Sequence, residues 1–275
     1  MSSSELQFFE TFGFLTLGGA LKSNEILRVV QAADLAFRKD AEGPNFVRGE
    51  RQQVNGMVEH CPDLAHLLCT DSLLRHVRLI LGDDPIWIGS DGSRYVGNTG
   101  WHPDGSNFGY KRLKVSIYLQ SLPSGQGCLR VLPGSHKPEF HECLHSLLQR
   151  PGDKIRPYGV RAPKRDEDML VFGMKATELP CVELPVELGD VILFDQNLWH
   201  ASYGGASGRK LLSMTFGERV SSRSVHFVSE MYRGQLEHIR QRQWNPRQTV
   251  YGHFLNEHPA PVAPLLKTPR ELGFL

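Results

Sequence analysis

Residues 113–120 read Leu-Lys-Val-Ser-Ile-Tyr-Leu-Gln, a strict alternation of apolar and polar side chains. Because side chains alternate between the two faces of a β-strand, this pattern predicts a strand with one face in a hydrophobic core and the other in a polar cavity or solvent. Turn-forming residues separate this strand from further short apolar runs, which lie at 86–89, 128–132, 182–186, 191–194 and 210–216. Many short strands divided by turns indicate an antiparallel sandwich or barrel.

The segments outside these runs have other patterns. Apolar residues recur at helical spacing over 23–37, where Ser23 can cap the helix, and over 63–81, where Gly82 can end it. Residues 139–180 combine a helical pattern with Pro, Gly and charged residues, which predicts an insertion or lid.

We expect the whole chain, residues 1–275, to form a single domain. Residues 1–84 are expected to be a helical wrapping and residues 85–220 the β-rich core that contains the insertion. Residues 221–275 are a polar, basic tail to which the sequence assigns no role.

Composition excludes several classes of partner. The chain has 31 Lys and Arg against 30 Asp and Glu, a formal net charge of +1. Nucleic-acid binding and polybasic membrane anchoring both need a cationic surface, so neither partner is expected. The five cysteines form no Cys-x-x-Cys pair, and no secretory signal or long apolar run is evident. We therefore predict a cytoplasmic protein that acts on a small molecule, with its oligomeric state left open.

One pair of residues suggests metal chemistry. His102-Pro-Asp104 lies in a Gly-rich loop just before the alternating strand, and His200 follows the apolar run 191–194. A lone His-x-Asp pair carries little weight in a chain with 12 histidines and 30 acidic residues. With a second histidine, however, the set matches the two-histidine, one-carboxylate triad that holds Fe(II) and leaves positions open for other ligands. The alternative is a surface loop and an unrelated histidine at a strand end.

Three stretches in fixed order make the pattern more specific. They are Trp101-His-Pro-Asp104, Gly127-Cys-Leu-Arg-Val-Leu-Pro-Gly-Ser-His136, and the segment from Gly189-Asp-Val through His200 to Arg209. Together they resemble the phytanoyl-CoA dioxygenase family of Fe(II)- and 2-oxoglutarate-dependent oxygenases. The resemblance implies a mainly β fold with outer helices around a double-stranded β-helix core (a jelly roll, cupin-like). It also implies Fe(II), 2-oxoglutarate and O2 as cofactors, with ascorbate as a stimulant.

The resemblance also implies roles for individual residues. It makes His102, Asp104 and His200 the catalytic iron ligands and pairs Arg209 with the distal carboxylate of 2-oxoglutarate, which a planar guanidinium can bind through two hydrogen bonds. The other residues implied to hold the co-substrate are Ser202, Tyr118, Thr99 and Asn98. The presence of Asp104 favours hydroxylation, because halogenases that resemble this family lack the carboxylate.

The substrate is less well defined. The stretch from Ser90 to Gly105 resembles the branch of the family that hydroxylates small organophosphonates, such as aminoalkylphosphonates, at the carbon next to phosphorus. Four polar residues nearby in sequence are candidates to bind such a substrate: Arg94, Asn107, Lys111 and Arg112. Competing substrates are amino acids, betaine-like compounds, natural-product intermediates and acyl-CoA.

Two alternatives come from other functional classes. One is a Zn- or Mn-dependent cupin-like hydrolase or isomerase, because two histidines and a carboxylate also bind zinc. Arg209 disfavours it, since hydrolysis does not need an arginine nine residues beyond the last ligand. The other is an inactive jelly-roll binding protein, which the complete triad disfavours.

Overall fold

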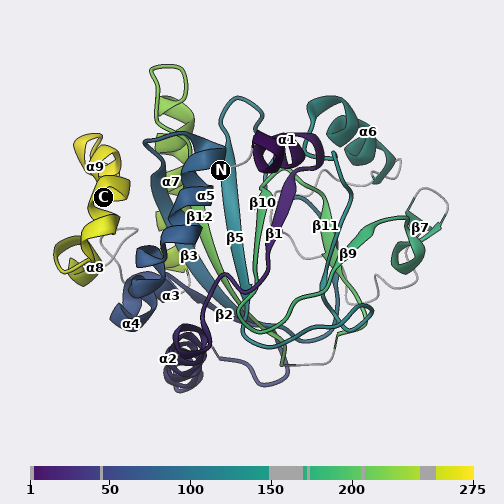
Figure 1. The fold of residues 1–275 in the computed structure, drawn as a ribbon, viewed down its shortest axis with the longest axis horizontal. Coiled ribbons are helices and arrows are strands. Elements are labelled where there is room, and N and C mark those ends of the chain that lie inside the picture. The colour runs from purple at the N-terminus through teal and green to yellow at the C-terminus, as the bar shows by residue number, and fades with distance from the viewer. Residues whose placement is uncertain (1–2, 44–45, 149–169, 172–173, 206–207, 242–251) are drawn as a thin grey trace.

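Two antiparallel sheets face each other at the centre of the computed structural model, which describes residues 3–43, 46–148, 170–171, 174–205, 208–241 and 252–275 (Figure 1). The six-stranded sheet has the order β1 (Phe14–Leu17), β10 (Val191–Asp195), β5 (Arg112–Tyr118), β12 (Lys210–Gly217), β3 (Ile86–Arg94) and β2 (Gln52–Asn55). The four-stranded sheet has the order β4 (Thr99–His102), β11 (His200–Ser202), β6 (Leu129–Val131) and β9 (Val182–Leu184). This is the two-sheet architecture that the sequence predicts.

Helices surround the sheets. Those of the first half are α1 (Ser3–Phe12), α2 (Ser23–Ala41), α3 (Met57–His60), α4 (Pro62–Ala65), the 3-10 turn η1 (His66–Cys69) and α5 (Asp71–Leu81). Those of the second half are α6 (Pro138–Leu148), η3 (Ala176–Glu178), α7 (Val225–Gln241), α8 (Gly252–Asn256), η4 (Ala260–Val262) and α9 (Ala263–Glu271). Most first-half helices lie outside the six-stranded sheet, together with α8 and α9 (Figure 1).

Strand β5 shows why the larger sheet has two different faces. Its outward side chains, Leu113, Val115 and Ile117, are fully buried in a hydrophobic core shared with the outer helices. Its inward side chains, Lys114 and Ser116 among them, line a cavity between the sheets. The alternation over 113–120 therefore correctly predicts one face in the hydrophobic core and the other in a polar cavity.

The first third of the chain is not helical throughout. It also supplies β1 and β2, which form the two edges of the larger sheet. The helix predicted over 63–81 is divided into α4, η1 and α5, and α5 starts afresh after Thr70, which is extended (ψ 107°) and occupies the N-cap position without a side-chain hydrogen bond. Ser23 is the first residue of α2 and not its cap. The cap is Lys22, whose backbone N–H donates to the Glu25 carboxylate at 2.8 Å.

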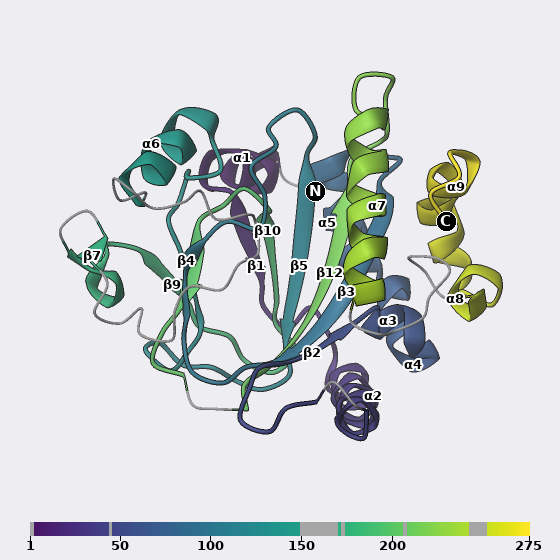
Figure 2. The same ribbon diagram turned by 180° about the vertical axis from the view of Figure 1, so that it is seen from behind.

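The tail packs against the larger sheet. Helix α7 runs along β3 and β12 (Figure 2), and the Tyr232 hydroxyl donates to the carbonyl of Trp87. Phe254, Val262 and Leu265 join the outer core. Residues 242–251 lie outside the described part of the tail.

Only the ends of the predicted insertion are described. They contain α6, η3 and the two-stranded ribbon of β7 (Leu170–Val171) and β8 (Met174–Lys175). Residues 149–169 and 172–173 lie outside the described residues, so the prediction of a lid stays untested there. None of the described helices has the length and apolar character needed to cross a membrane.

The outer core should carry much of the folding free energy. Leu212 is fully buried in it, whereas Leu27 on α2 is 54% exposed. We predict that Leu212→Ala lowers the free energy of unfolding by about 2–5 kcal/mol through lost contacts and a residual cavity. Leu27→Ala should change it by less than about 0.5 kcal/mol. Urea unfolding of both variants is the measurement, and equal losses would contradict this assignment of the core.

A buried carboxyl links α3 to β3 and should make stability depend on pH. Glu59 accepts hydrogen bonds from Trp87 Nε1 (3.0 Å) and from the Ser90 hydroxyl. Burial raises its pKa from 4.5 to about 7, against the opposing effect of these hydrogen bonds. The unfolded state therefore loses this proton at lower pH than the folded state, so this carboxyl destabilises the fold increasingly as pH rises from 4.5 to 7.

Glu59→Gln should remove that dependence, because an amide of the same shape does not titrate. Relative to this variant, the wild type should lose about 3 kcal/mol of unfolding free energy between pH 4 and pH 8, since each pKa unit corresponds to about 1.4 kcal/mol. Denaturant unfolding across this pH range tests the prediction. Parallel pH profiles for the two proteins would show that Glu59 does not titrate as proposed.

Candidate active site

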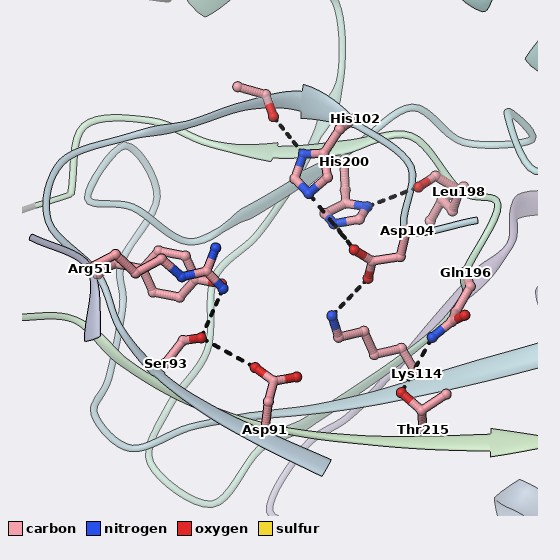
Figure 3. A network of polar contacts seen from close by, with 12 residues as sticks. Arg51, Asp91, Ser93, His102, Asp104, Lys114, Gln196, Leu198, His200 and Thr215 are labelled. Carbon is pink, nitrogen blue, oxygen red and sulfur yellow. Dashed lines mark hydrogen bonds and ion pairs between the residues drawn. The ribbon is translucent and has the colours of Figure 1, made fainter. Parts of the chain in front are cut away.

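His102 and His200 face each other across a strand pair. The register of β4 and β11 sets them directly opposite, with ring centroids 4.4 Å apart (Figure 3). His102 Nδ1 lies 2.7 Å from the Gly100 carbonyl oxygen, and His200 Nδ1 lies 2.9 Å from that of Leu198. Because a carbonyl only accepts, each Nδ1 carries the hydrogen, and each Nε2 has a free lone pair.

Asp104 brings a carboxylate to the same place. Its Oδ1 lies 3.8 Å from His102 Nε2 and 3.9 Å from His200 Nε2. One ligand atom from each of the three side chains falls within 4.8 Å of the others, although 98 residues separate the two histidines. Figure 3 shows the three side chains pointing toward one another. This is a donor set for one metal ion.

The protonation states suit metal binding. Burial and the neighbouring His102 lower the pKa of His200 to about 3, and desolvation also lowers the pKa of His102. Burial alone would raise the pKa of Asp104, but the Lys114 ammonium and the two histidines hold it well below its usual range. At neutral pH the set is two neutral imidazoles and a carboxylate, the forms that bind a metal.

Arg209 is a buried cation at another side of the same cavity. It is 2% exposed, and its Nε and Nη1 have no hydrogen-bond partner among the described residues. Its guanidinium lies against the backbone of Gly127 and Gly205, where a Cβ on either glycine would collide with Nη1. A buried guanidinium with unmatched N–H groups has the charge and the donors to bind an anion such as a carboxylate.

Residues 9–210 match the family model described as Phytanoyl-CoA dioxygenase (PhyH). The chain belongs to the phytanoyl-CoA dioxygenase family. It is therefore an iron- and 2-oxoglutarate-dependent oxygenase, in agreement with the triad and the buried arginine. A search of curated proteins found no match. The family assignment replaces the alternative of a Zn- or Mn-dependent cupin-like hydrolase or isomerase.

Solved structures confirm the fold of this PhyH-family chain. HygX from Streptomyces hygroscopicus, with nickel and 2-oxoglutarate bound, is 20% identical with a TM-score of 0.57, over 79% of this chain and 87% of that one. EctD from S. alaskensis gives the same identity and TM-score, over 79% and 77%. SnoK, an alpha ketoglutarate dependent carbocyclase from nogalamycin biosynthesis, is 18% identical with a TM-score of 0.55, over 82% and 90%.

The residues predicted to hold the co-substrate fall in two groups. Thr99, Tyr118 and Ser202 line the cavity with the triad and Arg209. Ser202 already donates its hydroxyl hydrogen to the Gly127 carbonyl at 2.7 Å, so it would have to turn to donate to a carboxylate. Asn98 is not among the lining residues, and its side-chain oxygen accepts the Gly204 N–H at 2.9 Å.

The four residues predicted to bind substrate do not line this cavity. Arg94 is exposed at the end of β3, and the Arg112 guanidinium lies over the ring of Phe227 on α7. Asn107 accepts the Gly109 N–H, and the Lys111 backbone N–H donates to Glu218.

Two cations in the cavity were not singled out from the sequence. Arg51, just before β2, donates to the Ser93 hydroxyl at 2.8 Å and lies over the ring of Tyr95, as Arg209 also does (Cζ to centroid 4.3 and 4.9 Å). Nothing in the pattern around Arg51 indicates a site. Lys114 lies in the alternating stretch itself, and its place on the polar face of that strand could have identified it.

Proposed function

We propose that this oxygenase binds Fe(II) through His102, Asp104 and His200, binds 2-oxoglutarate through Arg209, and hydroxylates a C–H bond of a small anionic molecule. The observation that carries the proposal is the convergence of three ligand atoms within 4.8 Å in the same cavity as a buried arginine with unmatched N–H groups. Two imidazoles and a carboxylate suit Fe(II), and a buried guanidinium suits a carboxylate, so the residues present fit both groups.

The protein's contribution is to position and shield. Bound iron and 2-oxoglutarate supply the chemistry that activates O2. The carbonyls of Gly100 and Leu198 fix the two imidazole rings, which keeps both Nε2 atoms aimed at one point. Arg209 orients the co-substrate from its glycine-lined pocket. Phe194 and Leu211 line the cavity with apolar surface that excludes water from the reaction.

The charge of the cavity favours an anionic substrate. Its lining side chains include three cations, Arg51, Lys114 and Arg209, and one carboxylate, Asp104, which leaves a net charge of +2. An Fe(II) ion and a 2-oxoglutarate dianion cancel each other, so this surplus remains for the substrate. An organophosphonate, hydroxylated at the carbon next to phosphorus, satisfies it best.

Other substrate classes are less suited to the net positive charge of the cavity. Acyl-CoA is anionic but much larger than the small polar molecule proposed here. An amino acid or a betaine-like compound carries one carboxylate against one cation and is neutral overall, whereas a doubly ionised phosphonate leaves even an aminoalkylphosphonate with a net negative charge. A natural-product intermediate stays an alternative because SnoK, which has the same fold, comes from nogalamycin biosynthesis.

The metal ligands can be tested without turnover. We predict that His200→Ala and Asp104→Ala each weaken Co(II) binding at least about 100-fold, because loss of a ligand should exceed the 10–100-fold loss typical of groups behind the ligands. His66→Ala removes an exposed histidine outside the site and should bind Co(II) as the wild type does. Calorimetric titration under nitrogen provides the measurement. Unchanged binding by Asp104→Ala would overturn the metal assignment.

Two glycines, one as test and one as control, can be substituted to test the role of Arg209 in 2-oxoglutarate binding. Gly127 and Gly125 both have positive φ (87° and 73°), but a Cβ on Gly127 would collide with Arg209, whereas one on Gly125 meets nothing within 4 Å. We predict that Gly127→Ala and Arg209→Leu each raise the KM for 2-oxoglutarate by about tenfold or more, because a lost charge-assisted hydrogen bond costs about 1.5–3 kcal/mol. Gly125→Ala should have much less effect. Equal effects of the two glycine variants would contradict this geometry.

A substrate panel tests the anion proposal. Succinate formation from 2-oxoglutarate under air, with Fe(II) and ascorbate, should be stimulated by aminoalkylphosphonates more than by the matching amino alcohols, which lack the anion. Stimulation by the amino alcohols alone would show that the surplus charge does not select the substrate. Absence of stimulation by every phosphonate would exclude the organophosphonate proposal.

A further inference from the structure

We propose that Lys114 is a positioning residue for the metal site, which holds one oxygen of Asp104 so that the carboxylate offers only its other oxygen to the ion. The inference rests on the proposed function of His102, Asp104 and His200 as metal ligands. It assigns a role to a side chain that neither the triad nor the co-substrate pocket explains.

The two oxygens of Asp104 have different partners. Oδ2 lies 2.7 Å from Lys114 Nζ, a charge-assisted hydrogen bond. Oδ1 is the oxygen that lies 3.8 and 3.9 Å from the Nε2 atoms of His102 and His200. Figure 3 shows Lys114 and the histidines approaching the carboxylate from different sides. The carboxylate is therefore already turned to present a single oxygen to the triad.

Lys114 forms its hydrogen bond with Asp104, although Asp91 is a second carboxylate close enough to raise the pKa of Lys114. Its side chain is 17% exposed, and Asp104 is its one recorded hydrogen-bond partner among the described residues. The register of β5 sets it beside Phe194 of β10 and Thr215 of β12, and Phe194 packs against His200 with ring centroids 4.9 Å apart. A mostly buried ammonium is expensive to leave without a carboxylate, so the pair with Asp104 should persist when a metal binds.

One-oxygen binding by Asp104 matters for the number of open coordination positions. An ion with six positions, three of them filled by the triad, keeps three for a chelating co-substrate and O2. A carboxylate that binds through both oxygens would occupy one of these. By engaging Oδ2, Lys114 prevents that second bond and keeps the position open. Its ammonium comes from the sheet opposite the histidines, so the two sheets together determine how Asp104 binds.

Lys114→Met tests the inference because it keeps the length of the side chain and removes the donor and the charge. In the Co(II) protein under nitrogen, we expect a changed visible absorption spectrum and a 2-oxoglutarate Kd about tenfold higher or more, as for other groups that orient a ligand. Loss of a nearby cation should leave Co(II) binding as tight as in the wild type or tighter. Lys114→Arg keeps a cationic donor and should restore the wild-type spectrum.

The matched control is Lys210→Met on the neighbouring strand β12. Lys210 also pairs with an aspartate, Asp34, but does not line the cavity, so its removal should leave the spectrum and the Kd unchanged. A wild-type spectrum and Kd in Lys114→Met would overturn the inference. If Lys114→Met does not fold, Lys114→Ala is expected to show the same changes, and their absence there overturns it equally.

The two levels of the proposal fail separately. Co(II) binding that does not depend on Asp104 would overturn the proposed metal site itself. Co(II) binding that requires Asp104 but is indifferent to Lys114 in spectrum and in 2-oxoglutarate affinity would overturn only the role of Lys114.

Discussion

The pairing of β4 with β11 is the constraint on which the site depends. It sets His102 opposite His200, and residues opposed in an antiparallel pair have Cβ atoms only about 5 Å apart. A slip of one residue would turn one histidine to the other face of the sheet, because side chains alternate along a strand. The other edge of β11 pairs with β6, where Val131 lies opposite His200, so the strand is fixed from both sides.

The six-stranded sheet, opposite the two histidines, supplies positively charged side chains to the site. Lys114 reaches Asp104 from β5, and Arg209 enters just before β12 into a pocket that only glycines can form. The inward face of the larger sheet therefore carries cations, while its outward face carries the hydrophobic core. The same alternation that buries Leu113 and Val115 also places Lys114 in the cavity. Strand β5 therefore contributes both to the hydrophobic core and to the site.

Those features of the fold and site that depend on a local pattern, or on motifs in a fixed order, can be predicted from the sequence. The alternation of 113–120 predicts both faces of β5, and the ordered motifs predict that His102, Asp104 and His200 lie together. Arg51 was missed because it precedes a short edge strand with no periodic signal. Arg94 and Arg112 were chosen for nearness in sequence, and neither is among the residues that line the cavity. The break at Thr70 is not evident from the sequence, because leucines recur at helical spacing on both sides of it.

A crystal structure of the anaerobic complex with Fe(II) and 2-oxoglutarate, with data collected at the iron absorption edge, tests the central claim most directly. We predict one anomalous peak bonded to His102 Nε2, His200 Nε2 and a single oxygen of Asp104, with the other oxygen still on Lys114 and the distal carboxylate of 2-oxoglutarate on Arg209. An iron peak away from these three side chains would contradict the account, as would a co-substrate that leaves Arg209 without a partner.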